Sequence, residues 1–331
     1  MDPFATRARK LVGSVLVESF FSLSARAARL HPQANPARHG VSVSRNHRYH
    51  PGAREEHLLD VYRREADLLA GKRAPIVFYV HGGGFRILSK DTHWVMGLGF
   101  AKQGFTVFNV NYRMAPAHRF PTALVDVCHA FEWVLDHAEA FGADPSRIIL
   151  AGESAGANLV TSLALACTYR RPEPWAARVF DRGVVPRAVL PASGIFQVSD
   201  VDRLARRKPS MPAYIADRLR EVETGYLGEP PYGASLDFAD PLTLLERGEA
   251  PDRPLPPFFL SVGTRDPLLD DTRRMDAALR HLGVPVETRY YPGEFHAFHA
   301  FVMRAAARQC WRDQFAFLRG LDLEHQAPAA A

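Results

Sequence analysis

Residues 148–158 read IILAGESAGAN, and this stretch decides the fold. The four apolar residues at its start are typical of a buried strand, whereas residues 155–169 carry a helical pattern of apolar side chains. Gly152 and Gly156 allow a sharp turn between the two, because they remove side chains that would collide with neighbouring backbone. A serine in such a turn is strained, and its hydroxyl stands exposed at the sheet edge above a helix N-terminus. Ser154 is therefore our candidate nucleophile.

The GxSxG pattern is specific enough to carry this interpretation. A chain of 331 residues with 23 glycines gives roughly 0.07 such matches by chance, before any strand–helix setting is required. The alternative interpretation is a glycine-rich turn whose serine has no chemical role.

The chain around this turn alternates short apolar runs with longer helical patterns. Such alternation is typical of βαβ units and predicts an α/β fold with a mainly parallel sheet and helices on both faces. The predicted strands cover residues 57–62, 76–81, 105–111, 148–151, 188–192, 258–262 and 287–291. The predicted helices cover about 92–103, 121–141, 155–169, 214–227, 270–282 and 300–319.

A second glycine-rich stretch, HGGGF at residues 81–85, follows the predicted strand over 76–81. Three consecutive glycines at a strand end let backbone pass close to a reacting group and point N–H groups at it. An acyl-transfer enzyme needs such donors for its oxyanion hole. With 14 histidines in the chain, chance gives only about 0.005 HGGG matches, so this motif is the more specific of the two.

A serine hydroxyl becomes a good nucleophile only when a base removes its proton and a carboxylate orients that base. Asp266 follows the predicted strand over 258–262, and His296 follows the strand over 287–291. Both therefore fall at C-terminal strand ends, on the same edge as Ser154. Acid and base follow the serine in this order in such topologies, so we assign Asp266 as the acid and His296 as the base.

Three neighbouring residues compete for these roles. Asp270 and Asp271 are expected to begin the next helix, where acidic side chains favour the N-terminal dipole. His299 lies one helical turn from His296 and is interpreted as a packed histidine.

Together these stretches resemble the hormone-sensitive-lipase-like family of α/β-hydrolase serine esterases, from about residue 57 to the C-terminus. The resemblance rests on HGGGF at 81–85, Asn111-Tyr112-Arg113, Ala115-Pro116, Phe120-Pro121, GESAGAN at 152–158, Asp266-Pro267-Leu268 and Tyr291-Pro292-Gly293 with His296. It implies an α/β-hydrolase fold with a helical cap and a triad of Ser154, Asp266 and His296. It also implies that the amides of Gly83, Gly84 and Ala155 form the oxyanion hole.

The chain departs from the family pattern at three positions. Ala157 and Ala297 stand where the family often has glycine, and Asn111 stands where it often has aspartate. Each alanine adds one methyl group, which affects the shape of the pocket rather than the reaction class.

The family resemblance also divides the chain. Residues 1–45 are expected to form the N-terminal part of the cap, and residues 195–250 a cap insertion. The hydrolase core then comprises residues 46–194 and 251–331. Phe85 and Phe20 are candidates for lining the acyl pocket, with core or cap packing as the other interpretation.

The N-terminal residues pose a choice between a helix and a secretory signal. Val12, Leu16, Phe20, Leu23 and Ala27 repeat at helical spacing, and Glu18 interrupts the apolar stretch. This pattern favours an amphipathic helix of the folded protein over a uniformly apolar signal segment. We therefore expect a cytoplasmic protein, with a cleaved signal as the alternative. No run approaches the ~18 apolar residues of a membrane-spanning helix.

Composition narrows the classes of partner. The chain carries 41 basic and 36 acidic residues, a formal charge of +5 spread along the sequence. The densest basic run, residues 203–208, is interpreted as a solvated helix face rather than a nucleic-acid site. HExxH, CxxC and EF-hand patterns are absent, and His296 and His299 lack an evident third ligand, so we expect neither a metal nor a cofactor.

The sequence thus predicts a serine carboxylesterase that acts on esters of small molecules through an acyl-enzyme on Ser154. The family resemblance implies short-to-medium-chain acyl groups. An amidase, a formamidase or an acyltransferase would use the same triad. A ligand-binding receptor that kept the fold without catalysis is the alternative from another class. A homodimer is left open.

Overall fold

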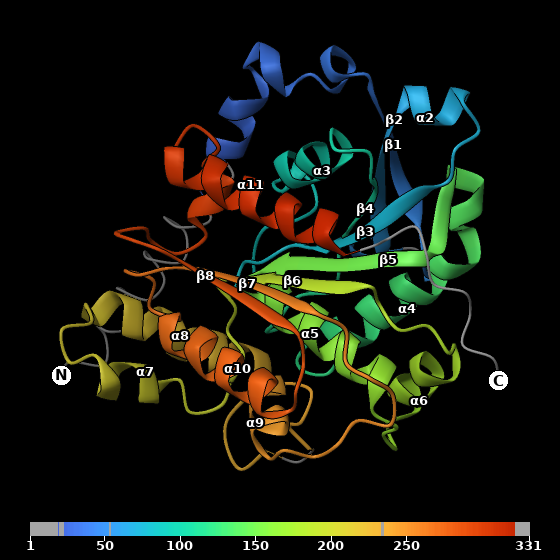
Figure 1. Cartoon of the computed structure of the whole chain (residues 1–331). Helices are drawn as coiled ribbons and strands as arrows, with labels where there is room; N and C mark the ends of the chain where they lie inside the picture. The colour runs from blue at the N-terminus through green and yellow to red at the C-terminus, as the bar shows by residue number, and fades with distance from the viewer. Residues whose placement is uncertain (1–18, 20–22, 53, 233–234, 322–331) are drawn as a thin grey trace.

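The computed structural model describes residues 19, 23–52, 54–232 and 235–321, which fold around one eight-stranded sheet (Figure 1). In space the strands run in the order β1-β2-β4-β3-β5-β6-β7-β8. Their bounds are β1 Val41–Arg48, β2 Leu58–Arg64, β3 Ala74–Val80, β4 Thr106–Val110, β5 Ala143–Glu153, β6 Ala188–Ala192, β7 Phe258–Gly263 and β8 Val286–Tyr291. β2 is antiparallel to both of its neighbours, and all other pairs are parallel.

The parallel register brings the strand ends that carry the candidate residues to one edge. Val80 at the end of β3 pairs with Gly152 of β5, and Glu153 pairs with Ala192 of β6. Gly263 at the end of β7 pairs with Tyr291 of β8. The loops after β3, β5, β7 and β8 therefore leave the sheet side by side, which is where open parallel sheets place their ligands.

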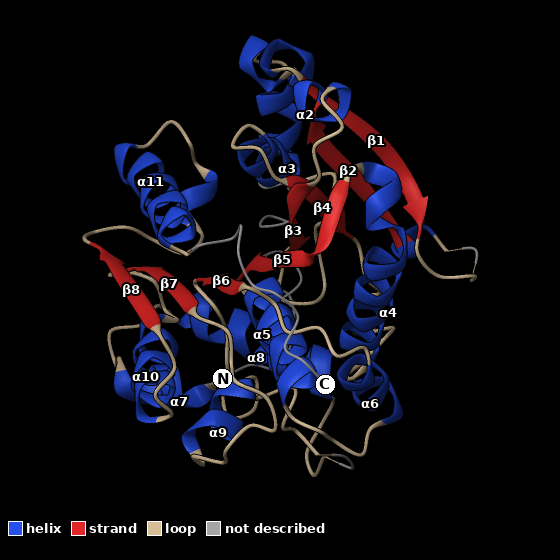
Figure 2. Cartoon of the chain, turned by 45° about the vertical axis from the view of Figure 1, so that its right-hand side comes forward, coloured by secondary structure: helices blue, strands red, loops and turns tan. Residues whose placement is uncertain are grey.

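Helices cover both faces of the sheet, as predicted (Figure 2). One face carries α3 Trp94–Ala101 and α11 Ala305–Gly320; the other carries α4 Thr122–His137, α5 Ala155–Thr168, α6 Pro174–Asp181, α9 Pro241–Glu246 and α10 Leu269–His281. Every residue of α5 is buried, because this helix lies between the sheet and the outer helices. Each Leu or Val buried in this way contributes about 1.5–3 kcal/mol to folding.

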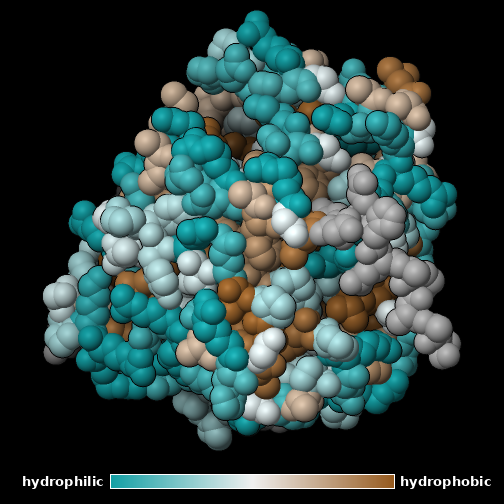
Figure 3. All heavy atoms as spheres, in the orientation of Figure 1, coloured by the Kyte–Doolittle hydropathy of each residue, from teal (hydrophilic) through white to brown (hydrophobic). Residues whose placement is uncertain are grey.

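The outer surface fits this layered arrangement. Figure 3 shows hydrophilic residues over most of one face, with apolar side chains gathered between the upper and lower helical layers. Among the described residues, no helix combines the length and apolar character needed to cross a bilayer.

All seven predicted strands are present, but the sequence prediction missed β1. This strand lies at the edge of the sheet, and only Val41 of its eight residues is buried. An edge strand with mostly polar side chains lacks the apolar run by which the other strands were found. The short helices α2 (Glu65–Leu69), α6 and α9 were also missed.

The segments predicted as cap contain three kinds of structure. Residues 23–29 are helical and lie against α3, where Trp94 Nε1 donates to the Ala25 carbonyl at 3.2 Å. Most of the rest of the predicted N-terminal helix, including Phe20, lies outside the described residues, as does most of the proposed signal segment. Residues 195–250 contain α7 (Asp202–Arg207), α8 (Ala213–Leu227) and α9. β1 begins at Val41, so the sheet starts inside the predicted 1–45 segment, and the proposed domain boundaries stay predictions.

One part of the basic run was interpreted wrongly. Arg203 is not on a solvated face but is 7% exposed, with its guanidinium bound to the carboxylate of Asp271 at 2.6 Å. Arg206 and Arg207 do face solvent, and each pairs with a carboxylate, Asp200 and Asp270 respectively.

Candidate active site

Ser154 lies in the turn between β5 and α5 in a conformation that few non-glycine residues adopt. Its φ is 56° and its ψ is −116°. The flanking glycines make this turn possible because backbone passes very close to them. A Cβ on Gly156 would lie 2.1 Å from the carbonyl oxygen of Val80, and a Cβ on Gly152 would lie 2.7 Å from the same atom. The turn therefore requires both glycines and holds Ser154 at the sheet edge.

The structure brings the predicted acid and base to this serine. His296 Nε2 lies 3.0 Å from Ser154 Oγ, and His296 Nδ1 lies 3.0 Å from Asp266 Oδ2. Asp266 is 2% exposed and also accepts a hydrogen bond from the amide of Leu268 at 2.8 Å. His296 remains about one-third exposed (34% for its side chain). This is the order of contacts that lets an imidazole remove a serine proton while a carboxylate fixes its orientation.

The charge of Asp266 controls the basicity of His296. Burial disfavours the imidazolium, but the electrostatic attraction and hydrogen bond of Asp266 outweigh this effect and raise the pKa of His296 above 6.5. The carboxylate of Glu153 raises that pKa further. A raised pKa makes His296 a stronger base toward the Ser154 hydroxyl.

The loop after β3 carries the three predicted glycines in conformations that a side chain would disturb. Gly83 has φ +105° and Gly84 has φ +60°. A Cβ on Gly83 would lie 2.0 Å from the carbonyl oxygen of Ile87, and a Cβ on Gly84 would lie 2.7 Å from Val222 of α8. Within the part of the chain that the structure describes, the amides of Gly83, Gly84 and Ala155 donate to no acceptor. They are thus free to bind an oxyanion.

Glu153, the residue before the candidate nucleophile, was not assigned a role from the sequence. It is 2% exposed, and its carboxylate accepts hydrogen bonds from the amide of Gly82 and the hydroxyl of Tyr79. His93 Nε2 lies 2.6 Å from the same carboxylate. The sequence does show a carboxylate at the end of a buried strand, and a buried carboxylate requires hydrogen-bond partners. No sequence spacing, however, identifies Tyr79 or His93 as those partners.

Helix α8 covers the glycine loop. Phe85 is fully buried and stacks on Tyr226 of α8, with ring centroids 3.7 Å apart and planes 3° from parallel. Arg86 pairs with Glu221 of the same helix at 3.1 Å. Phe85 therefore belongs to the contact between loop and helix in this structure, and its role in binding substrate stays a prediction.

The competing residues occupy other positions. Asp270 pairs with Arg207 at the surface. Asp271 is fully buried in the first turn of α10, where it binds Arg203 and accepts from the amide of Phe196, so it does more than favour the helix dipole. His299 is 4% exposed, and burial lowers its pKa to about 4, which keeps it neutral.

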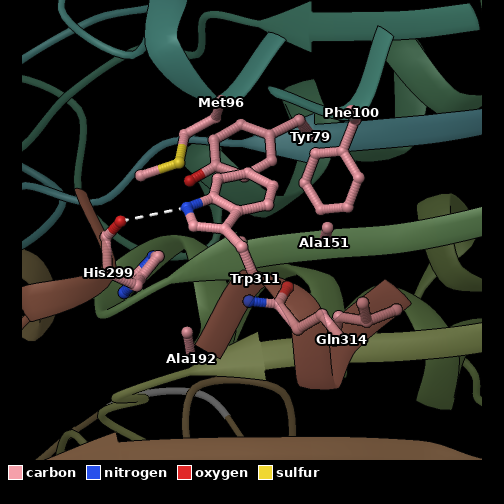
Figure 4. A pocket seen from close by; sticks show the side chains of 10 residues that line it. Tyr79, Met96, Phe100, Ala151, Ala192, His299, Trp311 and Gln314 are labelled. Atoms are coloured by element: carbon pink, nitrogen blue, oxygen red, sulfur yellow. Dashed lines mark hydrogen bonds between the residues drawn. The ribbon is translucent and has the colours of Figure 1, made fainter. Parts of the chain in front are cut away.

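A cavity that Gly152 of the turn helps to line is too small for an ester. Its volume is about 10 Å³, and it lies between the sheet and helices α3 and α11, lined by Tyr79, Met96, Phe100, His299, Trp311 and Gln314 among others (Figure 4). Trp311 Nε1 donates to the His299 carbonyl along its rim. Among the described residues, no three His, Cys, Asp or Glu side chains are grouped as a metal ion would require.

Known proteins are similar to this chain over most of its length. Residues 77–300 match the α/β-hydrolase fold family. Esterase LipQ of Mycobacterium tuberculosis is 30% identical over 78% of this chain, which spans 58% of the length of LipQ. Carboxylesterase NlhH of the same species is 32% identical to this chain. The match covers 75% of this chain and 74% of NlhH.

A solved structure agrees with these relatives. An esterase from the bacterial hormone-sensitive lipase family superposes with a TM-score of 0.65 and 26% identity, over 85% of each chain. The fold, the family match and the relatives point the same way: the chain belongs to the α/β-hydrolase fold family, among the esterases related to hormone-sensitive lipase.

Proposed function

We propose that the chain is a serine carboxylesterase that hydrolyses short-to-medium-chain acyl esters through an acyl-enzyme on Ser154. The observation that carries this proposal is the continuous contact from Asp266 through His296 to Ser154, with 3.0 Å on each side of the imidazole. The relatives, which are named as esterases, favour an ester as the acyl donor.

In the first half-reaction, Ser154 Oγ attacks the carbonyl carbon of the ester while His296 Nε2 takes the hydroxyl proton. The carbonyl π electrons move onto oxygen and form a tetrahedral oxyanion. Asp266 stabilises the imidazolium, which then gives its proton to the departing alkoxide as the bond between carbon and the alcohol oxygen breaks. The products are an acylated Ser154 and a neutral alcohol.

The amides of Gly83, Gly84 and Ala155 stabilise the oxyanion. Each N–H is without an internal acceptor among the described residues, so binding the oxyanion costs no existing hydrogen bond. One such donor typically contributes about 2.7–4 kcal/mol of barrier lowering.

In the second half-reaction, water takes the place of the serine hydroxyl. His296 removes a proton from the water as its oxygen attacks the acyl carbon, and the same proton is returned to Ser154 Oγ when the acyl bond breaks. The carboxylic acid leaves, and Ser154, His296 and Asp266 recover their initial states. Protein groups and water alone balance both half-reactions.

We propose further that residues 195–250, with the part of residues 1–45 that precedes β1, form a cap that shapes the acyl pocket. The contact of α8 with the glycine loop supports this role, because Val222 faces Gly84 and Tyr226 stacks on Phe85. A change in these side chains alters the space beside the oxyanion donors, and therefore the acyl groups that fit.

Stopped-flow hydrolysis of p-nitrophenyl esters from acetate to palmitate tests the proposal. We expect a burst of one p-nitrophenol per chain, a rate optimum at short-to-medium acyl length, and loss of both in Ser154→Ala. An optimum at palmitate contradicts the proposed chain length. Faster cleavage of the matching p-nitroanilides identifies an amidase. Preferred transfer of the acyl group to an added alcohol identifies an acyltransferase. Binding without turnover of any of these identifies a receptor.

A further inference from the structure

The buried carboxylate of Glu153 connects the nucleophile turn to the glycine loop. Glu153 immediately precedes Ser154, and its Oε1 accepts a hydrogen bond from the amide of Gly82 at 2.6 Å. The same oxygen lies 2.6 Å from His93 Nε2, and Oε2 accepts from the Tyr79 hydroxyl. Three donors thus hold a carboxylate that is 2% exposed. A buried carboxylate satisfied in this way is stable in only one arrangement of its partners.

His93 is the basic partner of Glu153. Its Nε2 faces the Glu153 carboxylate and donates to it, since a carboxylate can only accept. Its Nδ1 lies 3.0 Å from the carbonyl oxygen of Ser89 and 2.9 Å from the hydroxyl of Thr92, so the neighbouring residues also hold the ring. Burial disfavours the charge of His93 but Glu153 raises its pKa, and His93 holds the pKa of Glu153 below its usual range despite burial.

This ion pair determines which amides of the glycine loop are occupied. Gly82 N–H is bound to Glu153, whereas Gly83 and Gly84 N–H have no acceptor among the described residues. Close packing tightens the arrangement, because a Cβ on Gly82 would lie 2.7 Å from the carbonyl oxygen of Glu153 and 3.2 Å from Ser154 Cβ. The loop can therefore not move along β5 without breaking a charge-assisted hydrogen bond.

We propose that Glu153, charged and held by His93, is a positioning residue that fixes the oxyanion-binding amides relative to Ser154. This inference rests on the proposed function, since it assigns Gly83 and Gly84 to the oxyanion. Glu153 contacts none of the reacting atoms: it holds the loop through the amide of Gly82, and its charge also raises the pKa of His296. A displacement of donors by about 1 Å costs on the order of 100-fold in rate, so this positioning has a measurable effect.

The variant Glu153→Gln tests the role with little change in shape. The amide keeps one acceptor oxygen, which can serve Gly82 and His93 but carries no formal charge, and its NH₂ group cannot accept from Tyr79. The hydrogen bond that holds Gly82 is therefore weakened. We expect kcat for p-nitrophenyl butyrate to fall about 100-fold and KM to stay within threefold. The inhibition constant of a trifluoromethyl ketone, which adds Ser154 Oγ to its carbonyl and forms an oxyanion, should rise by a similar factor.

Asp60→Asn is the matched control. Asp60 is also a fully buried carboxylate that accepts from a backbone amide (Asn46, 2.9 Å) and pairs with a buried cation (Lys90 Nζ, 2.9 Å). It lies on β2, away from Ser154. We expect Asp60→Asn to lower the melting temperature as Glu153→Gln does, while the inhibition constant of the trifluoromethyl ketone stays unchanged.

A measurement on the unaltered protein keeps the inference testable if Glu153→Gln does not fold. With ¹⁵N-glycine labelling, the amide of Gly82 should exchange with solvent at least about 100-fold more slowly than those of Gly83 and Gly84. Addition of the trifluoromethyl ketone should then protect Gly83 and Gly84. Equal exchange of all three amides in the free protein would overturn the inference.

The outcomes also separate this inference from the proposed function. Absence of ester hydrolysis in the unaltered protein refutes the proposed function. Slow exchange at Gly82 would still show that its amide is bound to Glu153. Hydrolysis in the unaltered protein, with a kcat of Glu153→Gln within threefold of it, overturns the positioning role alone. An equal rise in the inhibition constant of the trifluoromethyl ketone in Asp60→Asn would also overturn the positioning role, because the effect would then follow from a general loss of stability.

Discussion

Two arms approach Ser154 from opposite sides of β5, and they are built in different ways. The oxyanion arm, residues 82–85 after β3, is held by the buried carboxylate of Glu153 and covered by α8. The acid–base arm consists of Asp266 after β7 and His296 after β8, and its imidazole is about one-third exposed (34% for the side chain). The first arm is tied by buried contacts of Glu153 and Phe85, whereas the base of the second arm is partly open to solvent.

The difference follows from what each arm does in the proposed reaction. Backbone amides stabilise an oxyanion best when they are already in place, because moving them during the reaction would cost free energy. A proton carrier must instead change its charge twice in each cycle and reach serine, alcohol and water in turn. Rigid burial suits the first task, and partial access suits the second.

The largest effect that sharpens this comparison is expected from the acid–base arm. Asp266→Asn should lower kcat by about 10⁴-fold, because an amide cannot hold the His296 tautomer that accepts the serine proton. Steady-state hydrolysis of p-nitrophenyl butyrate measures it. Asp270→Asn is the control, since Asp270 pairs with Arg207 at the surface, and its rate should stay within twofold. Equal losses in the two variants would contradict the assignment of Asp266.

A smaller effect is expected from the oxyanion arm. Gly84→Ala should lower kcat about 100-fold, because a Cβ would lie 2.7 Å from Val222 and force the loop to shift. Gly71→Ala has the same backbone strain, with φ +62° against +60°, but meets nothing within 4 Å. It should lose about 1 kcal/mol of stability and keep its kcat. A Gly84→Ala rate equal to that of the unaltered protein would show that the fixed loop is not required.

The rise of activity with pH should come from the acid–base arm. Only neutral His296 can accept the serine proton, and its raised pKa moves the transition above pH 6.5. The rate kcat/KM should therefore rise about tenfold per pH unit below that pKa and level off above it. Burial and the charge of His93 lower the pKa of His81, beside the oxyanion arm, to about 3, so His81 stays neutral throughout. A flat profile between pH 5 and 8 would contradict this division.

The smallest effect concerns the two alanines that stand where the family often has glycine. Ala297, next to His296, has φ +54°, so Ala297→Gly should stabilise the protein by about 1 kcal/mol in chemical denaturation. Ala157 is buried inside α5, and Ala157→Gly should destabilise it by about as much or more. Effects of the same sign at both positions would show that backbone conformation is not the cause.

Sequence reasoning located the strands and strand-end residues because their signals are local. A buried parallel strand is a continuous apolar run, and the ends of such strands must share one edge, which placed Ser154, Asp266 and His296 together in advance. The prediction missed β1 because an edge strand needs few apolar residues, and only Val41 is buried in this strand.

The contacts that hold the oxyanion arm could not be predicted in this way. His93 and Tyr79 are far from Glu153 in sequence. The pairing of β3 with β5 brings Tyr79 to Glu153, and the packing of α3 against the sheet brings His93 there. The burial of Arg203 depends in the same way on Asp271, which belongs to a different helix. Local patterns identify the candidate reactive residues, whereas the partners that support these residues depend on tertiary packing.

Covalent labelling tests the central claim most directly, namely that Ser154 is the nucleophile on which both arms act. The protein is treated with a p-nitrophenyl alkylphosphonate, which loses p-nitrophenol when a serine oxygen attacks phosphorus, and is then examined by intact and peptide mass spectrometry. The account predicts one adduct per chain, on Ser154, with loss of esterase activity in proportion to labelling and no adduct in Ser154→Ala. An adduct on another residue, or full inactivation with Ser154 unmodified, would contradict it.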